Sequence, residues 1–125
     1  MEDIKILVAT HKKYNMPKDD IYMPIHVGSD GKDYLGYVGD NTGDNISSKN
    51  AFYCELTGIY WAWKNLKADY IGLTHYRRHF SMRKIVPKTE NKKFEILLSE
   101  KQLRDILETT DIVLPKKRIY YIFCK

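Results

Sequence analysis

One short segment of the chain gathers the residue types that bind anions and move protons. It runs Thr74-His75-Tyr76-Arg77-Arg78-His79-Phe80, so two guanidinium groups stand beside two imidazoles. A guanidinium can donate two parallel hydrogen bonds to a phosphate, and an imidazole can accept or donate a proton near neutral pH. If the segment is extended, His75, Arg77 and His79 face one way. It therefore predicts an anion-binding site; the alternative is an exposed basic strand end that packs on its own aromatic residues.

The residues with metal-binding or redox chemistry do not form a recognised motif. His75 and His79 have a spacing that can ligate zinc on a helix, but they follow a predicted strand and have no acidic residue close by. Cys54 and Cys124 form no C-x-x-C pair and are expected to be free thiols. We therefore predict no metal ligand among these side chains.

A polar, glycine-containing stretch precedes the first predicted helix. It reads Asp40-Asn41-Thr42-Gly43-Asp44-Asn45-Ile46-Ser47-Ser48-Lys49-Asn50. It lacks the G-K-[ST] of a P-loop, and it lacks the glycine and final glutamate spacing of a calcium loop. The carboxylate of Asp44 and the amide of Asn45 could hold a sugar or a ribose. The alternative is a loop and helix cap that binds nothing.

Three further residues are candidates for the same chemistry. Glu55 lies on the border of the apolar face of the predicted helix, where it could act as a general base or bind a sugar hydroxyl. It could instead only favour the first helical turns by its charge. His11 and Lys12 follow the first predicted strand and could contact a nucleotide phosphate, or could form a basic turn without a ligand.

The pattern of apolar residues predicts the elements that position these side chains. Strands are predicted at 4–9, at 23–28 with Pro24 favouring an edge, in a central strand over the first half of 70–80, and at 111–115. Helices are predicted at about 50–67 and 99–108, the second opened by the capping box of Ser99 and Gln102. This order predicts an α/β fold with a largely parallel sheet. Ligands bind such sheets beyond the carboxyl ends of the strands, which places His11, Lys12 and 75–80 on one rim.

The first helix carries an apolar stripe at steps of four and three residues. The stripe consists of Phe52, Leu56, Ile59, Trp63 and Leu66, and Ser47 and Ser48 precede it as possible caps. The spacing predicts that these five side chains form the buried face of one continuous helix.

Length and composition limit the class of protein. The 125 residues are 43% hydrophobic and 30% charged, which is typical of one globular domain. No stretch has the length of a membrane span, and the first residues do not resemble a secretory signal, so a cytoplasmic location is expected.

The formal charge of +5 lies wholly in 81–125, with eleven basic and six acidic residues. This excess could mark an anionic partner such as nucleic acid or the inner face of a membrane, or be a solvated surface. No nucleic-acid motif is present, and no nucleic-acid partner is expected.

Four motifs in this order resemble those of a family of bacterial capsular and exopolysaccharide biosynthesis proteins. They are Ile6-Leu7-Val8-Ala9-Thr10-His11-Lys12-Lys13-Tyr14; Thr42-Gly43-Asp44-Asn45-Ile46-Ser47; Tyr53-Cys54-Glu55-Leu56-Thr57 with Tyr60-Trp61-Ala62-Trp63-Lys64-Asn65; and Asp69-Tyr70-Ile71-Gly72-Leu73-Thr74-His75-Tyr76-Arg77-Arg78. The resemblance implies a glycosyltransferase of the GT-A, Rossmann-like kind. It also implies that 1–125 is one domain, resembling the N-terminal, nucleotide-sugar-binding half of a longer, truncated enzyme.

The resemblance assigns roles to the candidate residues. A UDP- or GDP-sugar would be the donor, and a growing glycan or lipid-linked oligosaccharide of capsule, exopolysaccharide or lipopolysaccharide synthesis would be the acceptor. Cofactor-binding residues would be His11, Lys12, Asp44, Asn45, Arg77 and Arg78; catalytic residues would be Glu55 and His75. Many GT-A enzymes hold a divalent metal with an Asp-x-Asp motif, which is absent here. A metal remains possible, but the departing diphosphate would be stabilised by Arg and His. The alternative is a truncated module that binds a nucleotide or a partner without turnover.

Overall fold

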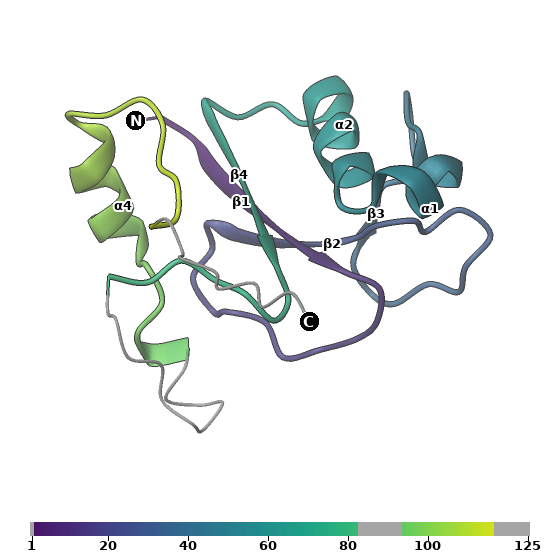
Figure 1. Cartoon of the computed structure of the whole chain (residues 1–125), viewed down its shortest axis with the longest axis horizontal. Coiled ribbons are helices and arrows are strands. Elements are labelled where there is room, and N and C mark those ends of the chain that lie inside the picture. Colours follow the sequence, from purple (N-terminus) through teal and green to yellow (C-terminus); the bar gives the residue numbers. More distant parts are fainter. Residues whose placement is uncertain (1, 83–93, 117–125) are drawn as a thin grey trace, which may run out of the picture.

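Parallel strands form the centre of the fold in the computed structural model, which describes residues 2–82 and 94–116. The described strands form one four-stranded parallel sheet in the order β3-β2-β1-β4, with α1 and α2 on one side and α4 on the other (Figure 1). The strands are β1 (Ile4–Thr10), β2 (Tyr22–His26), β3 (Val38–Gly39) and β4 (Tyr70–His75); the helices are the 3-10 helix η1 (Ser47–Lys49), α1 (Asn50–Tyr53), α2 (Leu56–Asn65) and α4 (Glu100–Leu107). The predicted α/β fold with a parallel sheet is confirmed.

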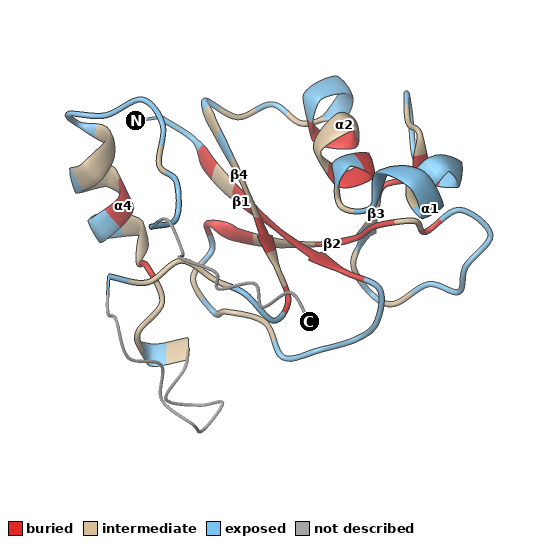
Figure 2. Cartoon of the chain, in the orientation of Figure 1, coloured by how far each residue is buried: buried red, intermediate tan, exposed pale blue. Residues whose placement is uncertain are grey.

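Strand β1 separates two apolar clusters. Its residues Ile4, Ile6 and Val8 face a cluster that includes Leu103 of α4, whereas Leu7 and Ala9 face a cluster on the α2 side; that second cluster also contains Ile25, Val27, Trp61 and Ala62. Figure 2 shows the buried colour running along β1 and β2. Since both faces of β1 are covered, its central residues Ile6–Ala9 are apolar in succession and do not alternate with polar residues.

The prediction of a single helix over 50–67 is wrong, because the helical conformation is interrupted at Cys54. This residue has φ 51° and ψ −131°, so α1 ends at Tyr53 and α2 starts at Leu56. The break changes which side of the following turns faces the sheet. It divides the predicted stripe between two short helices.

The predicted buried stripe is wrong for three of its five residues, whereas Ile59 and Leu66 are partly buried against the cluster on the α2 side. Phe52, Leu56 and Trp63 are 85%, 56% and 69% exposed, and the buried residues of α2 are instead Thr57, Gly58, Trp61 and Ala62. Gly58 explains the choice of face, since a Cβ there would lie 2.9 Å from a methyl carbon of Val27. The helix therefore approaches Val27 closely at Gly58, and Trp61 is buried on the same side, whereas Leu56 and Trp63 are exposed.

The two strands predicted in the first half of the chain are present, but the second is not an edge strand of the described sheet. The strand predicted at 4–9 is β1, which extends to Thr10, and the strand at 23–28 corresponds to β2. Pro24 pairs with Val8 of β1, and the two-residue β3 pairs only with the two residues after Pro24. Pro24 thus has no partner strand on its other side, although β2 as a whole lies inside the described sheet.

Two further strand predictions are corrected. Strand β4 was expected to be central, but it lies at the end of the described sheet, and β1 is its neighbour. Residues 111–115 were expected to form a strand, but they form no strand in the structure, and Ile112 and Leu114 are 75% and 77% exposed. The strand-like run at 119–123 lies outside the described residues.

The capping box that opens the last described helix is confirmed. The Ser99 hydroxyl accepts a hydrogen bond from the Gln102 backbone N–H at 3.2 Å, and the Gln102 side chain accepts one from the Ser99 N–H at 3.0 Å. Helix α4 has eight residues and α2 has ten. In the described parts of the chain, no helix has the length and apolar character needed to cross a membrane.

Candidate functional site

Strands β1, β2 and β4 end at the same edge of the sheet, at Thr10, His26 and His75. We call these three residues and those that directly follow them the carboxyl edge. In the strand register, Thr10 of β1 pairs with His26, and its neighbour Ala9 pairs with His75. His11 continues from Thr10 between the two flanking strands. The topology therefore brings His11 and His75 to one edge of the sheet, as the α/β pattern predicted.

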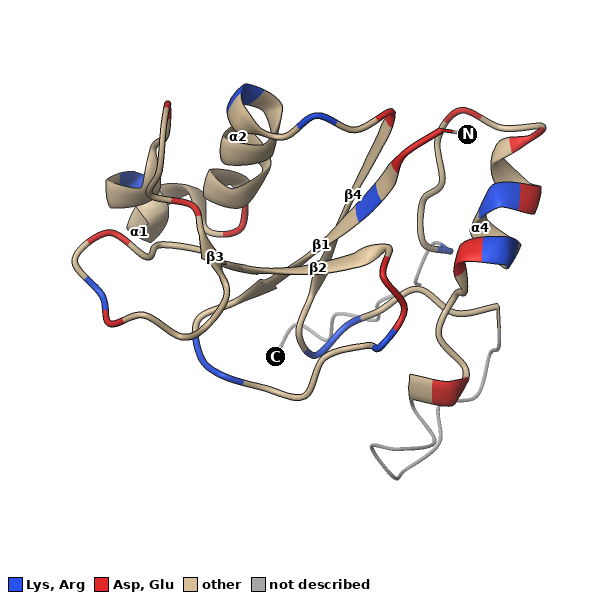
Figure 3. Cartoon of the chain, turned by 180° about the vertical axis from the view of Figure 1, so that it is seen from behind, with Lys and Arg blue, Asp and Glu red and all other residues tan. Residues whose placement is uncertain are grey.

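The buried ring of Tyr76 gathers cationic groups at this edge. The Lys12 Nζ lies 5.7 Å from the ring centroid, and the Arg77 guanidinium carbon lies 5.3 Å from it. The rings of Tyr14 and His75 also pack on Tyr76, with centroids at 5.1 and 4.3 Å. In Figure 3, the segments that follow β1 and β4 carry basic residues along the same edge of the molecule. Lys12 and Arg77, distant in sequence, thus share one aromatic support.

The chain turns immediately after β4 and does not stay extended. The backbone N–H of Arg78 donates to the His75 carbonyl at 2.8 Å, and the His75 N–H donates to the Arg78 carbonyl at 3.2 Å. The Arg77 N–H donates to Nδ1 of His75 at 3.2 Å. The turn corrects the extended arrangement considered for His75, Arg77 and His79. It instead folds both arginines back beside the imidazole.

Charged neighbours from two other elements act on His75. Burial lowers the pKa of His75 below its ordinary value; Glu55 opposes the shift, whereas His11, Arg77 and Arg78 add to it. These interactions place Glu55, from the start of α2, in the field of the carboxyl edge. A neutral imidazole is favoured, and a neutral imidazole can accept a proton.

Two predicted site residues lie elsewhere. The Asp44 carboxylate accepts a hydrogen bond from the Tyr60 hydroxyl at 2.9 Å and lies 4.0 Å from Nζ of Lys64. Both partners belong to α2 and lie farther along it than Glu55. Asn45 uses its side chain within the loop, donating to the Gly43 carbonyl and accepting from the Ser47 N–H. The structure therefore does not bring Asp44 and Asn45 to His75.

Asp40 is a buried carboxylate that sequence reasoning did not single out. Its side chain accepts hydrogen bonds from the N–H groups of Gly28 and Ser29 and from the hydroxyls of Ser29, Ser47 and Thr57, at 2.5–3.1 Å. Burial alone would raise the pKa of Asp40, but these hydrogen bonds together lower it below its ordinary value. Asp40 thus links the chain after β2, η1 and the first turn of α2 by hydrogen bonds, and so holds these segments together next to the carboxyl edge. No sequence signal separates it from Asp44.

Gly28 is expected to be intolerant of substitution for two reasons, its backbone conformation and the lack of space for a side chain. It has φ +66°, and an added Cβ would lie 2.6 Å from the Asn50 side chain, whereas Gly31 has φ +71° with open space around it. Gly28→Ala should therefore lower the free energy of unfolding by about 1–3 kcal/mol more than Gly31→Ala, which carries only the backbone cost. Urea denaturation of both variants measures the difference. Equal losses would show that the side chain of Asn50 moves aside freely.

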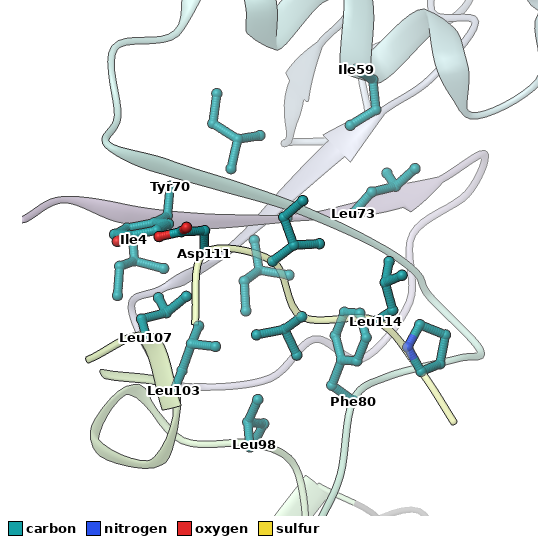
Figure 4. A pocket seen from close by; sticks show the side chains of 16 residues that line it. Ile4, Ile59, Tyr70, Leu73, Phe80, Leu98, Leu103, Leu107, Asp111 and Leu114 are labelled. Carbon is teal, nitrogen blue, oxygen red and sulfur yellow. The ribbon is translucent and has the colours of Figure 1, made fainter. Parts of the chain in front are cut away.

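An apolar pocket lies away from the carboxyl edge. It has a volume of about 430 Å³ and is lined by β4 residues 70–73, by α4 and by 111–115. Figure 4 shows Ile4, Leu98 and Leu114 around this space, with Asp111 as its acidic residue. None of the predicted site residues lines it. Its walls suit apolar groups rather than a phosphate.

The residues at the carboxyl edge do not fit a divalent metal. Within residues 2–82 and 94–116, no group of three or more His, Cys, Asp or Glu side chains is placed to hold an ion. Asp40 is surrounded by hydrogen-bond donors, and Glu55 is a carboxylate whose charge acts on His75.

The described strands form a parallel α/β sheet with imidazoles and cationic side chains at its carboxyl edge, which is the edge where sheets of this class bind ligands. The chain belongs to the family described as Domain of unknown function (DUF4422), whose model matches residues 5–124. It is similar to the solved apo structure of WbbM, a bifunctional glycosyltransferase, at 40% identity and a TM-score of 0.77. The match covers 91% of this chain and 23% of that one. No curated protein matches the chain.

Proposed function

We propose that this chain forms the donor-binding side of a glycosyltransferase that moves a sugar from a nucleotide-sugar to a growing glycan. The support is the 40% identity to a chain titled as a bifunctional glycosyltransferase, spread over 91% of the present chain. The family resemblance adds capsule, exopolysaccharide or lipopolysaccharide synthesis at the cytoplasmic face of the membrane as the setting. In this proposal 1–125 corresponds to the N-terminal half of the transferase domain.

The observation that carries the proposal is the cationic cluster at the carboxyl edge. Lys12 and Arg77 share the Tyr76 ring, and Arg78 and His11 act on the same imidazole, so their positive charges converge from two strands. The diphosphate of a nucleotide-sugar is a compact dianion that such a cluster attracts. During sugar transfer the charge on the departing diphosphate increases, so cations fixed beside it favour the transition state over the ground state.

Glu55 and His75 are the acid–base groups of the proposed reaction. The acceptor hydroxyl attacks the anomeric carbon, its proton passes to Glu55 or to neutral His75, and the bond from the anomeric carbon to the diphosphate oxygen breaks. The electron pair of that bond leaves with the diphosphate. Asp44 and Asn45 are left out of the donor site in this proposal, because their polar groups bond to α2 and to their own loop.

The second candidate is a module that binds a nucleotide or a partner without turnover. It is favoured by one observation, that the match spans 23% of the glycosyltransferase chain. The two candidates agree on the ligand and differ only in turnover.

Nucleoside diphosphates are expected to stabilise the protein against heat. At 100 times its dissociation constant, UDP or GDP should add about 2.7 kcal/mol to the free energy of unfolding, whereas uridine or guanosine, which lack phosphate, should add much less. Differential scanning fluorimetry measures the shift in Tm. Release of nucleoside diphosphate from a UDP- or GDP-sugar distinguishes the enzyme from the binding module. Equal shifts with nucleoside and diphosphate would contradict the proposed anion site.

A further inference from the structure

The joint between α1 and α2 holds an unfavourable backbone conformation. Cys54 has φ 51° and is the one non-glycine residue with positive φ in the part of the chain that the structure describes. A residue with a Cβ adopts this region only when its surroundings over-determine it. The neighbouring contacts therefore have to supply the constraint.

Asn50 supplies that constraint from both sides of the Cys54 residue. Its carbonyl accepts a hydrogen bond from the Cys54 N–H at 2.8 Å, and its side-chain Nδ2 donates to the Cys54 carbonyl at 2.8 Å. The same Nδ2 donates to the Thr57 hydroxyl at 3.0 Å. One side chain thus fixes the turn that ends α1 and starts α2.

The Asn50 side chain is itself anchored to the sheet. The Thr57 hydroxyl that it contacts donates to the Asp40 carboxylate at 2.6 Å, and Asp40 also accepts from the Gly28 N–H at the end of β2. The Asn50 amide occupies the space that a Cβ at position 28 would need, so it packs directly on the backbone of Gly28. The turn at Cys54 is therefore held in a fixed relation to the carboxyl edge.

Glu55 is the residue that follows this turn. We infer that Asn50 is a positioning residue, which fixes the strained Cys54 turn and so holds the Glu55 carboxylate toward His75 at the carboxyl edge. The role of Glu55 and His75 in acid–base chemistry rests on the function proposed above, whereas the hydrogen bonds that Asn50 makes to the Cys54 turn do not. Had one helix continued through 50–67, the direction of Glu55 would be set by the helix alone, without the turn.

The charged groups around His75 make this geometry measurable. Burial is the largest cause that lowers the pKa of His75, and His11 after β1 and the two arginines of its own turn lower it further. Glu55, one residue before α2, raises it. Removing the Glu55 charge, or moving it away, therefore lowers the pKa of His75 further. A substitution that only loosens the fold leaves this electrostatic balance unchanged while the protein is folded.

Asn65→Ala is a matched control for Asn50→Ala. The Nδ2 of Asn65 also donates two hydrogen bonds, to the carbonyls of Asp44 and Trp61 at 2.9 and 3.0 Å, and it lies at the opposite end of α2 from Glu55. Both variants remove the same groups and neither changes the charge. They should therefore both reduce stability, but only one should affect Glu55.

The experiment is an NMR titration of the His75 imidazole in the ligand-free full chain. We expect Glu55→Gln to lower the pKa of His75, Asn50→Ala to lower it by at least half as much, and Asn65→Ala to leave it unchanged. The double variant Asn50→Ala with Glu55→Gln should show no further lowering. If Asn50→Ala does not fold, Asn50→Ser, which leaves a smaller gap beside Gly28, carries the test.

Two outcomes overturn the inference. A wild-type pKa for His75 in the Asn50 variants, with a lowered one in Glu55→Gln, would show that Asn50 does not position the carboxylate. An unchanged pKa in Glu55→Gln would show that the two side chains do not face each other. Neither result depends on nucleotide binding, so failure of the proposed function, seen as no diphosphate binding by the wild type, is a separate result.

Discussion

Asp40→Ala is expected to lower the free energy of unfolding by about 3–5 kcal/mol, which is a large share of the stability of a small domain. The carboxylate is fully buried and accepts five hydrogen bonds. Its removal leaves two backbone N–H groups and three hydroxyls without their acceptor in the interior, and each unpaired buried group is costly. Urea denaturation followed by circular dichroism measures the loss.

Asp44→Ala is the control for this prediction. Asp44 is another loop aspartate four residues away, but its side chain is exposed and contacts only the surface of α2. Its removal should change the free energy of unfolding by no more than about 0.5 kcal/mol. If the two variants were equally stable, the hydrogen bonds around Asp40 would contribute little beyond ordinary surface contacts.

The same carboxylate makes stability depend on pH in a defined direction. The pKa of Asp40 in the folded protein is lower than its ordinary value of 3.8, so the unfolded chain binds the proton more readily. The contribution of Asp40 is therefore fully present above that ordinary pKa and is lost as the pH falls through the lower, folded pKa. Asp40→Asn should remove this part of the acid dependence, and its stability should fall less steeply below pH of about 4.

The elements that could be predicted from sequence are those specified by local residues. The apolar run of β1 and the capping box of α4 need no distant partner to be recognised, and both are present in the structure. The α1–α2 region could not be predicted in this way. Its buried face is chosen by the approach of Gly58 to Val27, which is distant in sequence. Its break is held by short-range hydrogen bonds of Asn50 to Cys54 and Thr57, which the spacing of apolar residues does not reveal.

The candidate site could be predicted in part for a topological reason. His11 and Lys12 were grouped with His75 and Arg77 because parallel strands end at a common edge, and the register of β1 and β4 bears out that grouping. Asp40 could not be found, because its five donors come from three separate segments. An exposed loop aspartate and a buried one look the same in a polar, glycine-containing stretch.

Arg77→Ala is expected to weaken nucleoside diphosphate binding by about 1–3 kcal/mol, or about 5- to 150-fold in Kd, if the proposed donor site is correct. The guanidinium lies on the Tyr76 ring beside Lys12, and hydrogen bonds from a charged donor to phosphate are the strongest this cluster can offer. Arg77→Lys keeps the charge but loses the two-pronged donor, so its Kd should fall between those of the wild type and the alanine variant. Isothermal titration calorimetry with UDP and GDP measures the three affinities.

Lys64→Ala separates a site effect from a general loss of positive charge. Lys64 also lies over an aromatic ring, with Nζ 3.8 Å from the Trp63 centroid, but it is on the outer part of α2 and not at the carboxyl edge. Its removal should leave the Kd unchanged at moderate salt, where exposed charges beyond about 10 Å are screened. Equal losses of affinity in both variants would mean that the diphosphate responds to net charge alone. A loss confined to Arg77 would place the phosphate at the turn after β4, because only a directed donor at short range produces that difference.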